Sequence, residues 1–243
     1  MRHIFAAAGL VALSVTTLGS AASAATATFE FGCGGGVVCD SPSSSNSNVN
    51  SLSSSFDLTD GGLTVTASAG FFEGGVSFLT ATNIITSADP QDNAKIGRFV
   101  GGAGVFSAPD GNHTVDGFDT NNDFIKLSFS QDVALSEIGF GFFGRNDDFR
   151  YLYDVDGDGD IDEGDFLSDQ FAVVDPFADV APASSSVWAV AAFGANDSWK
   201  LSSVTVSFDD ASVPLAPVPL PAAGWMLLAA LGGMAGVRRR FSA

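Results

Sequence analysis

Basic residues are scarce in this chain of 243 residues, which has 10 lysines and arginines against 28 aspartates and glutamates. All of the acidic residues lie between the two terminal segments, where six basic residues remain, so the central body carries 6 − 28 = −22 charges. Such a field repels nucleic acids and anionic membrane surfaces and attracts divalent cations. The composition therefore excludes nucleic acid as a partner.

Catalytic residue types are also scarce, because His113 is the only histidine between the terminal segments. A Ser-His-Asp triad needs a histidine beside a serine in a strained turn, and the sequence has no G-x-S-x-G motif. Acidic residues are so abundant that the presence of two carboxylates does not by itself indicate a glycoside hydrolase. We therefore predict a protein that is not an enzyme, and keep a glycoside hydrolase with a carboxylate pair as the third alternative.

Cysteine occurs only twice, as Cys33 and Cys39 in the stretch CGGGVVC. The C-x2-C spacing of a zinc site is absent, and so is a second pair of ligands. In an exported protein two cysteines this close are expected to form a local disulfide, with the intervening glycines allowing a tight turn.

Helical periodicity is almost absent from the body, where alternation of apolar and polar residues dominates. The alternation marks residues 63–67, 125–129 and 204–208, and apolar runs at 133–143 and 187–193 add two further strands. Frequent glycines and Asn-Asp pairs supply turns. These features predict a mainly β fold over residues 25–212, an antiparallel β-sandwich of jelly-roll-like topology with a serine-rich loop at 41–55.

A short sequence echo links two turns of the body. FGRNDDF at 143–149 resembles FGANDSW at 193–199, and a shorter relative, NDF, stands at 122–124. We expect Asn-Asp to cap each turn and the aromatic residue after it to open a buried strand. The alternative is a set of carboxylates gathered at one end of the sandwich to bind a ligand or a cation.

The most specific internal motif is DVDGDGDIDEGD, residues 154–165. It resembles the twelve-residue calcium loop of EF-hands, in which Asp154, Asp156 and Asp158 would take positions 1, 3 and 5. Gly159 would then stand at position 6, where the chain turns sharply. A hard cation that prefers six to eight oxygen ligands suits carboxylates at alternate positions, so we expect calcium as the cofactor.

The second half of the motif completes the expected ligand set. Asp160 would offer its backbone carbonyl at position 7, Asp162 a water-mediated contact at position 9, and Asp165 the closing carboxylate at position 12. With Glu163, seven carboxylates crowd these twelve residues, and without a cation they would repel one another.

The segments beside the calcium loop differ from those of an EF-hand, which would have a helix on each side. Residues 149–153 alternate as in a strand, and residues 163–171 are expected to form at most one or two turns of helix. The loop also resembles those of dockerin modules, but dockerins pair two loops and this chain has one. A single loop between strands is expected to pin a protrusion rather than to sense calcium.

The N-terminus has the features of a secretory signal peptide. A short basic start precedes an apolar run from Ile4 to Leu18, and Ala22, Ser23 and Ala24 fit the A-x-A cleavage pattern. We therefore expect residues 1–24 to be removed on export.

The C-terminal segment, residues 213–243, combines a proline-rich stem with a short apolar helix. The helix expected at 222–237 would be about 24 Å long at 1.5 Å per residue, which is marginal for a bilayer core of about 30 Å. Arg238, Arg239 and Arg240 follow it and are expected to stop transfer and stay on the cytoplasmic side.

These three parts together resemble the VPLPA variant of PEP-CTERM sorting signals, whose motif is here Val218, Pro219, Leu220, Pro221 and Ala222. The commoner motif has glutamate where Leu220 stands, so the exosortase variant remains open. The resemblance implies export from a Gram-negative bacterium, an inner-membrane intermediate, and cleavage by an exosortase near the proline motif. It also implies a final place at the cell surface or in an exopolysaccharide-rich extracellular matrix, with exopolysaccharide as a further partner.

The sequence as a whole predicts an exported, non-enzymatic surface or matrix protein, associated with exopolysaccharide or biofilm, stabilised by calcium and sorted by its tail. The alternative is a carbohydrate-binding module that presents exposed aromatic side chains. The candidates for that role are Trp188, Trp199, Tyr151 and Tyr153, although we expect all four to pack in the core.

Overall fold

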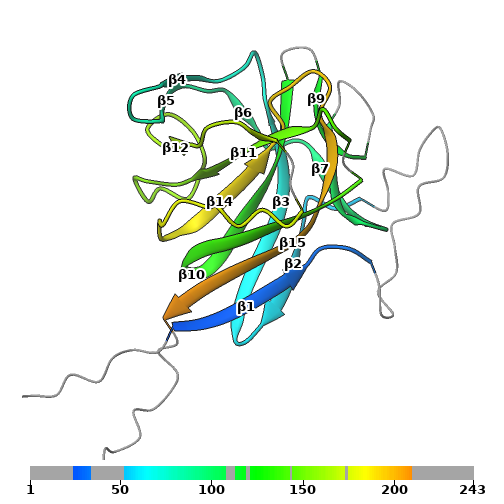
Figure 1. Cartoon of the computed structure of the whole chain (residues 1–243), viewed down its shortest axis with the longest axis vertical. Coiled ribbons are helices and arrows are strands. Elements are labelled where there is room, and N and C mark those ends of the chain that lie inside the picture. The colour runs from blue at the N-terminus through cyan, green and yellow to red at the C-terminus, as the bar shows by residue number, and fades with distance from the viewer. Residues whose placement is uncertain are drawn as a thin grey trace, which may run out of the picture. The chain divides into compact units, whose positions relative to one another are not determined.

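The computed structural model describes residues 24–33, 52–107, 113–118, 121–142, 144–172 and 175–209. These residues form strands and no helix (Figure 1). The strands are β1 (Ala24–Glu30), β2 (Ser55–Asp60), β3 (Leu63–Phe72), β4 (Ser77–Leu79), β5 (Ile84–Ser87), β6 (Pro90–Gln91), β7 (Lys95–Phe99), β8 (Gly102–Phe106), β9 (Val115–Phe118), β10 (Asn121–Gly141), β11 (Asp148–Tyr153), β12 (Phe166–Leu167), β13 (Phe171–Ala172), β14 (Ser185–Ala191) and β15 (Ser198–Asp209).

The longest strand, β10, connects two sets of neighbours. Its first half pairs with β3 over residues 122–129 and with β14 over residues 124–128. Its second half pairs with β15 over residues 134–141, and the exposed residues 130–132 separate the halves. The set around the first half also contains β2, β11, β12, β5 and β4, and the set around the second also contains β1, β8 and β7. All pairings between the named strands are antiparallel.

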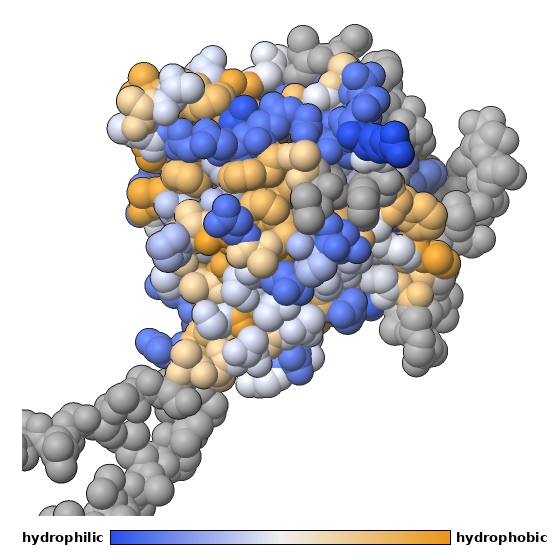
Figure 2. Space-filling view, in the orientation of Figure 1, coloured by the Kyte–Doolittle hydropathy of each residue, from blue (hydrophilic) through white to orange (hydrophobic). Residues whose placement is uncertain are grey.

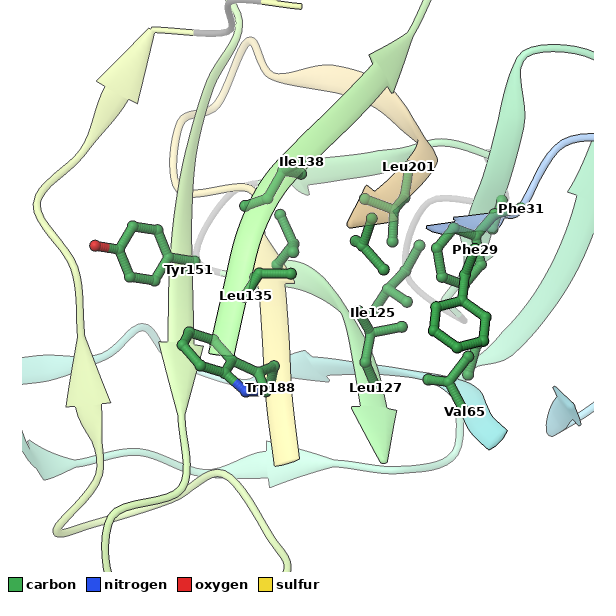
Figure 3. Packing of buried hydrophobic residues seen from close by; sticks show 14 of the residues in the cluster. Phe29, Phe31, Val65, Ile125, Leu127, Leu135, Ile138, Tyr151, Trp188 and Leu201 are labelled. Carbon is green, nitrogen blue, oxygen red and sulfur yellow. The ribbon is translucent and has the colours of Figure 1, made fainter. Parts of the chain in front are cut away.

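The larger hydrophobic cluster joins side chains from both halves of β10. Ile125 and Leu127 from the first half pack in one group with Leu135 and Ile138 from the second, and Trp188 of β14 lies beside them (Figure 3). The indole N–H of Trp188 donates to the carbonyl oxygens of Val133 and Ser185, so this large buried side chain also satisfies its polar atom. Alternate residues of each half therefore face a shared core.

A second cluster lies on the other face of β14. It consists of Phe72, Ile85, Phe124, Leu152, Ile161, Leu167, Val187, Ala189 and Ala191. Successive residues of β14 alternate between the clusters, because Trp188 and Val190 belong to the larger one. Burial on both faces explains why this strand is a nearly continuous apolar run in the sequence.

The strands predicted at 63–67, 125–129 and 204–208 are confirmed within β3, β10 and β15. The run at 187–193 corresponds to β14, and the run at 133–143 to the second half of β10, which ends at Gly141. Phe142 follows with a φ of 55°, a left-handed conformation that stops the extended chain. Phe143 lies outside the described residues.

Two local predictions were wrong. The serine-rich loop was placed at 41–55, but Ser53 forms a bridge with Ile96 and Ser55 begins β2, so the pairing starts inside the expected loop. The one or two helical turns expected within 163–171 are absent from this described segment, where β12 and β13 pair with β11. Long-range strand pairing overrides the weak local preference in both places.

The strands that begin and end the body lie side by side, since Ala24 of β1 pairs with Asp209 of β15 (Figure 1). The unit Ala24–Asp209 is compact by itself. Among the described residues there is no helix with the length and apolar character needed to cross a membrane. Residues 1–23 of the expected signal peptide, the sorting motif at 218–222, the helix at 222–237 and the arginines at 238–240 lie outside the described residues, whereas Ala24, the last residue of the expected signal peptide, begins β1.

Candidate functional site

The acidic loop at 154–165 connects two paired strands. Leu152 pairs with Leu167 and Tyr153 with Phe166, so β11 and β12 form the stem of a hairpin. Asp154 follows the first strand directly and Asp165 precedes the second. The first and last positions of the expected calcium loop therefore stand at the base of one hairpin loop.

Three of the expected ligands lie close together. One carboxylate oxygen each from Asp154, Asp156 and Asp158 falls within 4.8 Å of the others. Asp154 is buried, whereas Asp156 and Asp158 are exposed. Within the described part of the chain, this is the one group of three such side chains with metal-binding spacing.

The loop is wound around the buried carboxylate of Asp154. Its two oxygens accept hydrogen bonds from the backbone N–H groups of Gly157 at 2.6 Å and Gly159 at 2.9 Å. Gly157 and Gly159 have φ values of 81° and 95°, in the region that favours glycine. The sharp turn expected at position 6 is thus present, and position 4 makes a second one.

The closing residue is buried at the other end of the loop. The carboxylate of Asp165 accepts hydrogen bonds from the backbone N–H of Val155 at 2.8 Å and of Asp162 at 2.9 Å. Burial raises the pKa of Asp165 to about 6, and the nearby carboxylates of Asp154 and Asp156 act in the same direction. Asp165 therefore ties the two ends of the loop together, and its carboxylate is not part of the group formed by Asp154, Asp156 and Asp158.

Asp160 and Asp162 also lie outside that group of three. The carboxylate of Asp160 forms an ion pair with Lys126 of β10 at 2.9 Å, which leaves its role at position 7 to its backbone carbonyl. The pKa of Asp162 is raised first by burial and then by the neighbouring acidic side chains, with Asp158 and Asp156 foremost. Acidic side chains around Asp162 thus disfavour its charged form, which is the repulsion expected from the sequence.

The donor atoms of this loop suit a hard divalent cation. Carboxylate and carbonyl oxygens are the only metal-binding groups in residues 154–165, and no thiol or imidazole stands among them. Calcium accepts six to eight such oxygens in flexible geometry, whereas zinc prefers nitrogen and sulfur. The residues therefore fit calcium.

The two echoed turns brace each other through their buried aspartates. Asp147 accepts a hydrogen bond from the backbone N–H of Gly144 in its own turn and another, at 3.2 Å, from that of Ser198. Asp197 accepts one from Phe193 in its own turn at 3.1 Å and another from Asp148 at 2.8 Å. Each carboxylate thus binds its own turn and the residue that follows the other aspartate.

This reciprocal bonding favours turn chemistry over the alternative of a ligand site built from these carboxylates. The aromatic residues after the turns, Phe149 and Trp199, are fully buried, as expected. Burial raises the pKa of Asp197, while the hydrogen bonds from Asp148, Gly194 and Phe193 oppose that shift. The repeated motif was visible in the sequence, but the cross-bonding between its two copies was not, because the partners are about fifty residues apart.

The four aromatic candidates for sugar binding do not form an exposed platform. Trp188, Trp199 and Tyr151 are buried, and Tyr153 is half-buried. Tyr153 stacks on Phe166 with ring centroids 4.6 Å apart. The expectation that these side chains pack in the core is confirmed for the three buried ones.

The exposed surface is mixed in character. Figure 2 shows a hydrophilic band across the upper part of the visible face, with hydrophobic residues scattered below it. The exposed large hydrophobic side chains of the described residues are Leu79, Val100, Phe142 and Val155, and they come from four different segments of the chain.

His113 and Lys200 form a small structural cluster. The ring of His113 lies 5.4 Å from that of Phe99 and 5.5 Å from that of Phe106, while Lys200 Nζ donates to the backbone oxygen of His113. Lys200 also lies 4.2 Å from the ring centroid of Phe99.

Cys33 is disulfide-bonded. Its expected partner, Cys39, is the other cysteine of the sequence and lies outside the described residues. Cys33 is anchored to the body by a hydrogen bond from its backbone N–H to the carbonyl oxygen of Phe99 at 3.1 Å.

Comparisons of this chain with protein-family models, curated proteins and solved structures found no match. Its function therefore has to be inferred from its own residues.

The reciprocal aspartates should be energetically coupled. Because each carboxylate binds both turns, the destabilisation of an Asp147→Ala, Asp197→Ala double variant should differ from the sum of the single variants by about 0.5–3 kcal/mol. Each single variant should lower the free energy of unfolding, because removing a carboxylate takes the charged acceptor away from two part-buried hydrogen bonds, each worth about 1.5–3 kcal/mol. Urea unfolding of the four proteins measures this cycle, and strict additivity would contradict the brace.

Lys200 should make the free energy of unfolding depend on pH in the alkaline range. Burial lowers the pKa of Lys200 to about 8, whereas the unfolded side chain titrates near 10.5. Between these values the unfolded chain holds a proton that the folded protein has lost, so the free energy of unfolding should rise with pH. Comparing the protein with Lys200→Met by urea unfolding at pH 7.5, 8.5 and 9.5 isolates this effect, and a constant difference between the two would disprove it.

Proposed function

We propose that this chain is an exported, non-enzymatic protein of the cell surface or extracellular matrix, stabilised by calcium in the loop at 154–165. The observation that carries the calcium assignment is the convergence of Asp154, Asp156 and Asp158 in a hairpin loop that turns sharply at Gly159. The net charge of −22 on the body, from 6 − 28, supports a cationic partner.

The residues that would hold calcium are Asp154, Asp156 and Asp158 through their carboxylates and Asp160 through its backbone carbonyl. Asp162 would contribute through water, and Asp165 would shape the loop from its buried position. The bound ion would offset the mutual repulsion of the acidic side chains. Because a single extracellular loop rarely binds tightly, we expect a dissociation constant of about 10⁻⁴ to 10⁻³ M.

The β-sandwich remains the finer proposal for the fold. It is supported by the different pairing partners of the two halves of β10 and by the packing of their alternate side chains in one cluster. A jelly-roll-like order of strands belongs to the same proposal. In this arrangement the acidic loop would lie over the face of β14 that packs in the second cluster, because Ile161 of the loop belongs to that cluster.

The sorting proposal rests on the two ends of the chain. The VPLPA motif, a short apolar helix and Arg238–Arg240 resemble a PEP-CTERM signal, and a signal peptide at 1–24 would start export from a Gram-negative bacterium. Ala24, the last residue of the expected signal peptide, pairs with Asp209 near the end of the body. An exosortase would process the inner-membrane intermediate, and exopolysaccharide is the proposed neighbour of the released protein.

Calorimetry tests the calcium assignment. The protein should bind one calcium ion per chain, and an Asp154→Asn, Asp158→Asn double variant should lose this binding because two of the three converging carboxylates are neutralised. A matched Asp92→Asn, Asp132→Asn variant removes the same charge at exposed positions outside the loop and should bind normally. Equal binding by both variants would refute the site.

Intact mass of the exported protein tests the sorting assignment. The mature chain should lack residues 1–24 and the residues that follow its cleavage near the 218–222 motif. A secreted protein whose C-terminus is still Ala243 would contradict processing by an exosortase.

A further inference from the structure

The hairpin formed by β4 and β5 has few attachments to the rest of the described chain. β5 pairs with β4 and, through Ile84 and Phe166, with the two-residue strand β12. Three further backbone hydrogen bonds hold it. Ile85 donates to Asp165 at 2.8 Å and accepts from Gly164 at 3.0 Å, and Asn83 accepts from Leu167 at 2.8 Å. All of these backbone contacts go to residues 164–167, the end of the acidic loop and β12, and one side-chain contact goes to β11, where Arg150 lies 4.9 Å from the ring centroid of Phe78.

The same hairpin and the acidic loop cover one apolar surface. Ile161, at position 8 of the loop, is 2% exposed, and Ile85 of β5 is 1% exposed. Both belong to the second cluster, against which Val76 and Phe78 also pack. The loop and the hairpin therefore each contribute a buried isoleucine to the cluster that also contains Val187, Ala189 and Ala191 of β14.

A second anchor holds the loop on this surface from the opposite side. Lys126, in the first half of β10, forms an ion pair with Asp160, the residue that precedes Ile161. It is the one salt bridge among the described residues. The loop is thus tied to β10 through Asp160, to the second cluster through Ile161 and to β5 through Gly164 and Asp165.

From these connections we propose that calcium binding at residues 154–165 controls the docking of the β4–β5 hairpin over the second cluster. The inference rests on the proposed calcium site and adds a consequence to it. If the loop opens, the hairpin loses Gly164 and Asp165 as backbone partners and Ile161 as a neighbour in the second cluster, and keeps its backbone bonds to β12. A cation that binds only the closed loop therefore stabilises the docked hairpin, by at most the same factor.

The size of the coupling follows from this linkage. At free calcium about 100-fold above the dissociation constant, the equilibrium for opening of the loop falls about 100-fold. Where the hairpin can open only with the loop, hydrogen exchange of its amides slows by the same factor. The core pairing of β3 with β10 does not depend on the loop and keeps its exchange rates.

Hydrogen exchange of the full-length protein, followed by mass spectrometry, tests the proposal in a calcium chelator and in saturating calcium. The amides of residues 83–87 should exchange up to about 100-fold more slowly with calcium, together with those of 157–167. The Asp154→Asn, Asp158→Asn variant should show no response to calcium in either segment. An Ile161→Thr variant should bind calcium but show a smaller response at 83–87, because the shared apolar contact is weakened.

Val155→Thr is the matched control, since it makes the same kind of change at a loop residue that is 52% exposed. It should respond to calcium as the unaltered protein does. Calcium binding that slows exchange in the loop but leaves residues 83–87 unchanged would overturn the control of the hairpin and leave the calcium site standing. Absence of calcium binding in calorimetry would instead remove the proposed site itself.

Discussion

Strand β10 has to satisfy two different sets of neighbours with one continuous run of alternating residues. Its first half is held between β3 and β14, its second half pairs with β15, and both contribute alternate side chains to the same hydrophobic cluster. The exposed residues 130–132 allow the change of partner, since no apolar side chain is needed there. The position of β14, and therefore of β11 and the acidic loop beyond it, depends on this arrangement.

The two echoed turns lie at the ends of strands, where backbone N–H groups no longer find partners in a sheet. Asp147 and Asp197 supply carboxylate acceptors at these positions, and each serves two segments. A buried carboxylate is costly unless it accepts several hydrogen bonds, and here backbone donors from both turns reach each one. The repeated Asn-Asp-aromatic pattern is thus explained by reciprocal bonding together with burial of the next aromatic ring.

Local patterns predicted the parts of the fold that depend on one face of one strand. Alternation located β3, the first half of β10 and β15, and the register of the acidic motif predicted the turn at Gly159. The failures concern contacts between distant segments. The sequence around 163–171 is too short and too polar for periodicity to separate a helical turn from a strand, and its pairing with β11 and β5 decides the outcome.

The acidic loop divides its carboxylates into two kinds. Asp154 and Asp165 are buried at the two ends and accept backbone hydrogen bonds, so they shape the loop through contacts within the protein. Asp156 and Asp158 are exposed, and each accepts a single backbone hydrogen bond, Asp156 from the N–H of Asp158 at 3.1 Å and Asp158 from that of Asp160 at 2.9 Å. Because Asp154 belongs to both the internal network and the converging group, a cation there would stabilise the same conformation that the backbone bonds select. Ile161 packs in the second cluster with Ile85 of β5, and Lys126 of β10 forms an ion pair with Asp160, so the acidic loop, besides being the proposed metal site, is a structural part of the body.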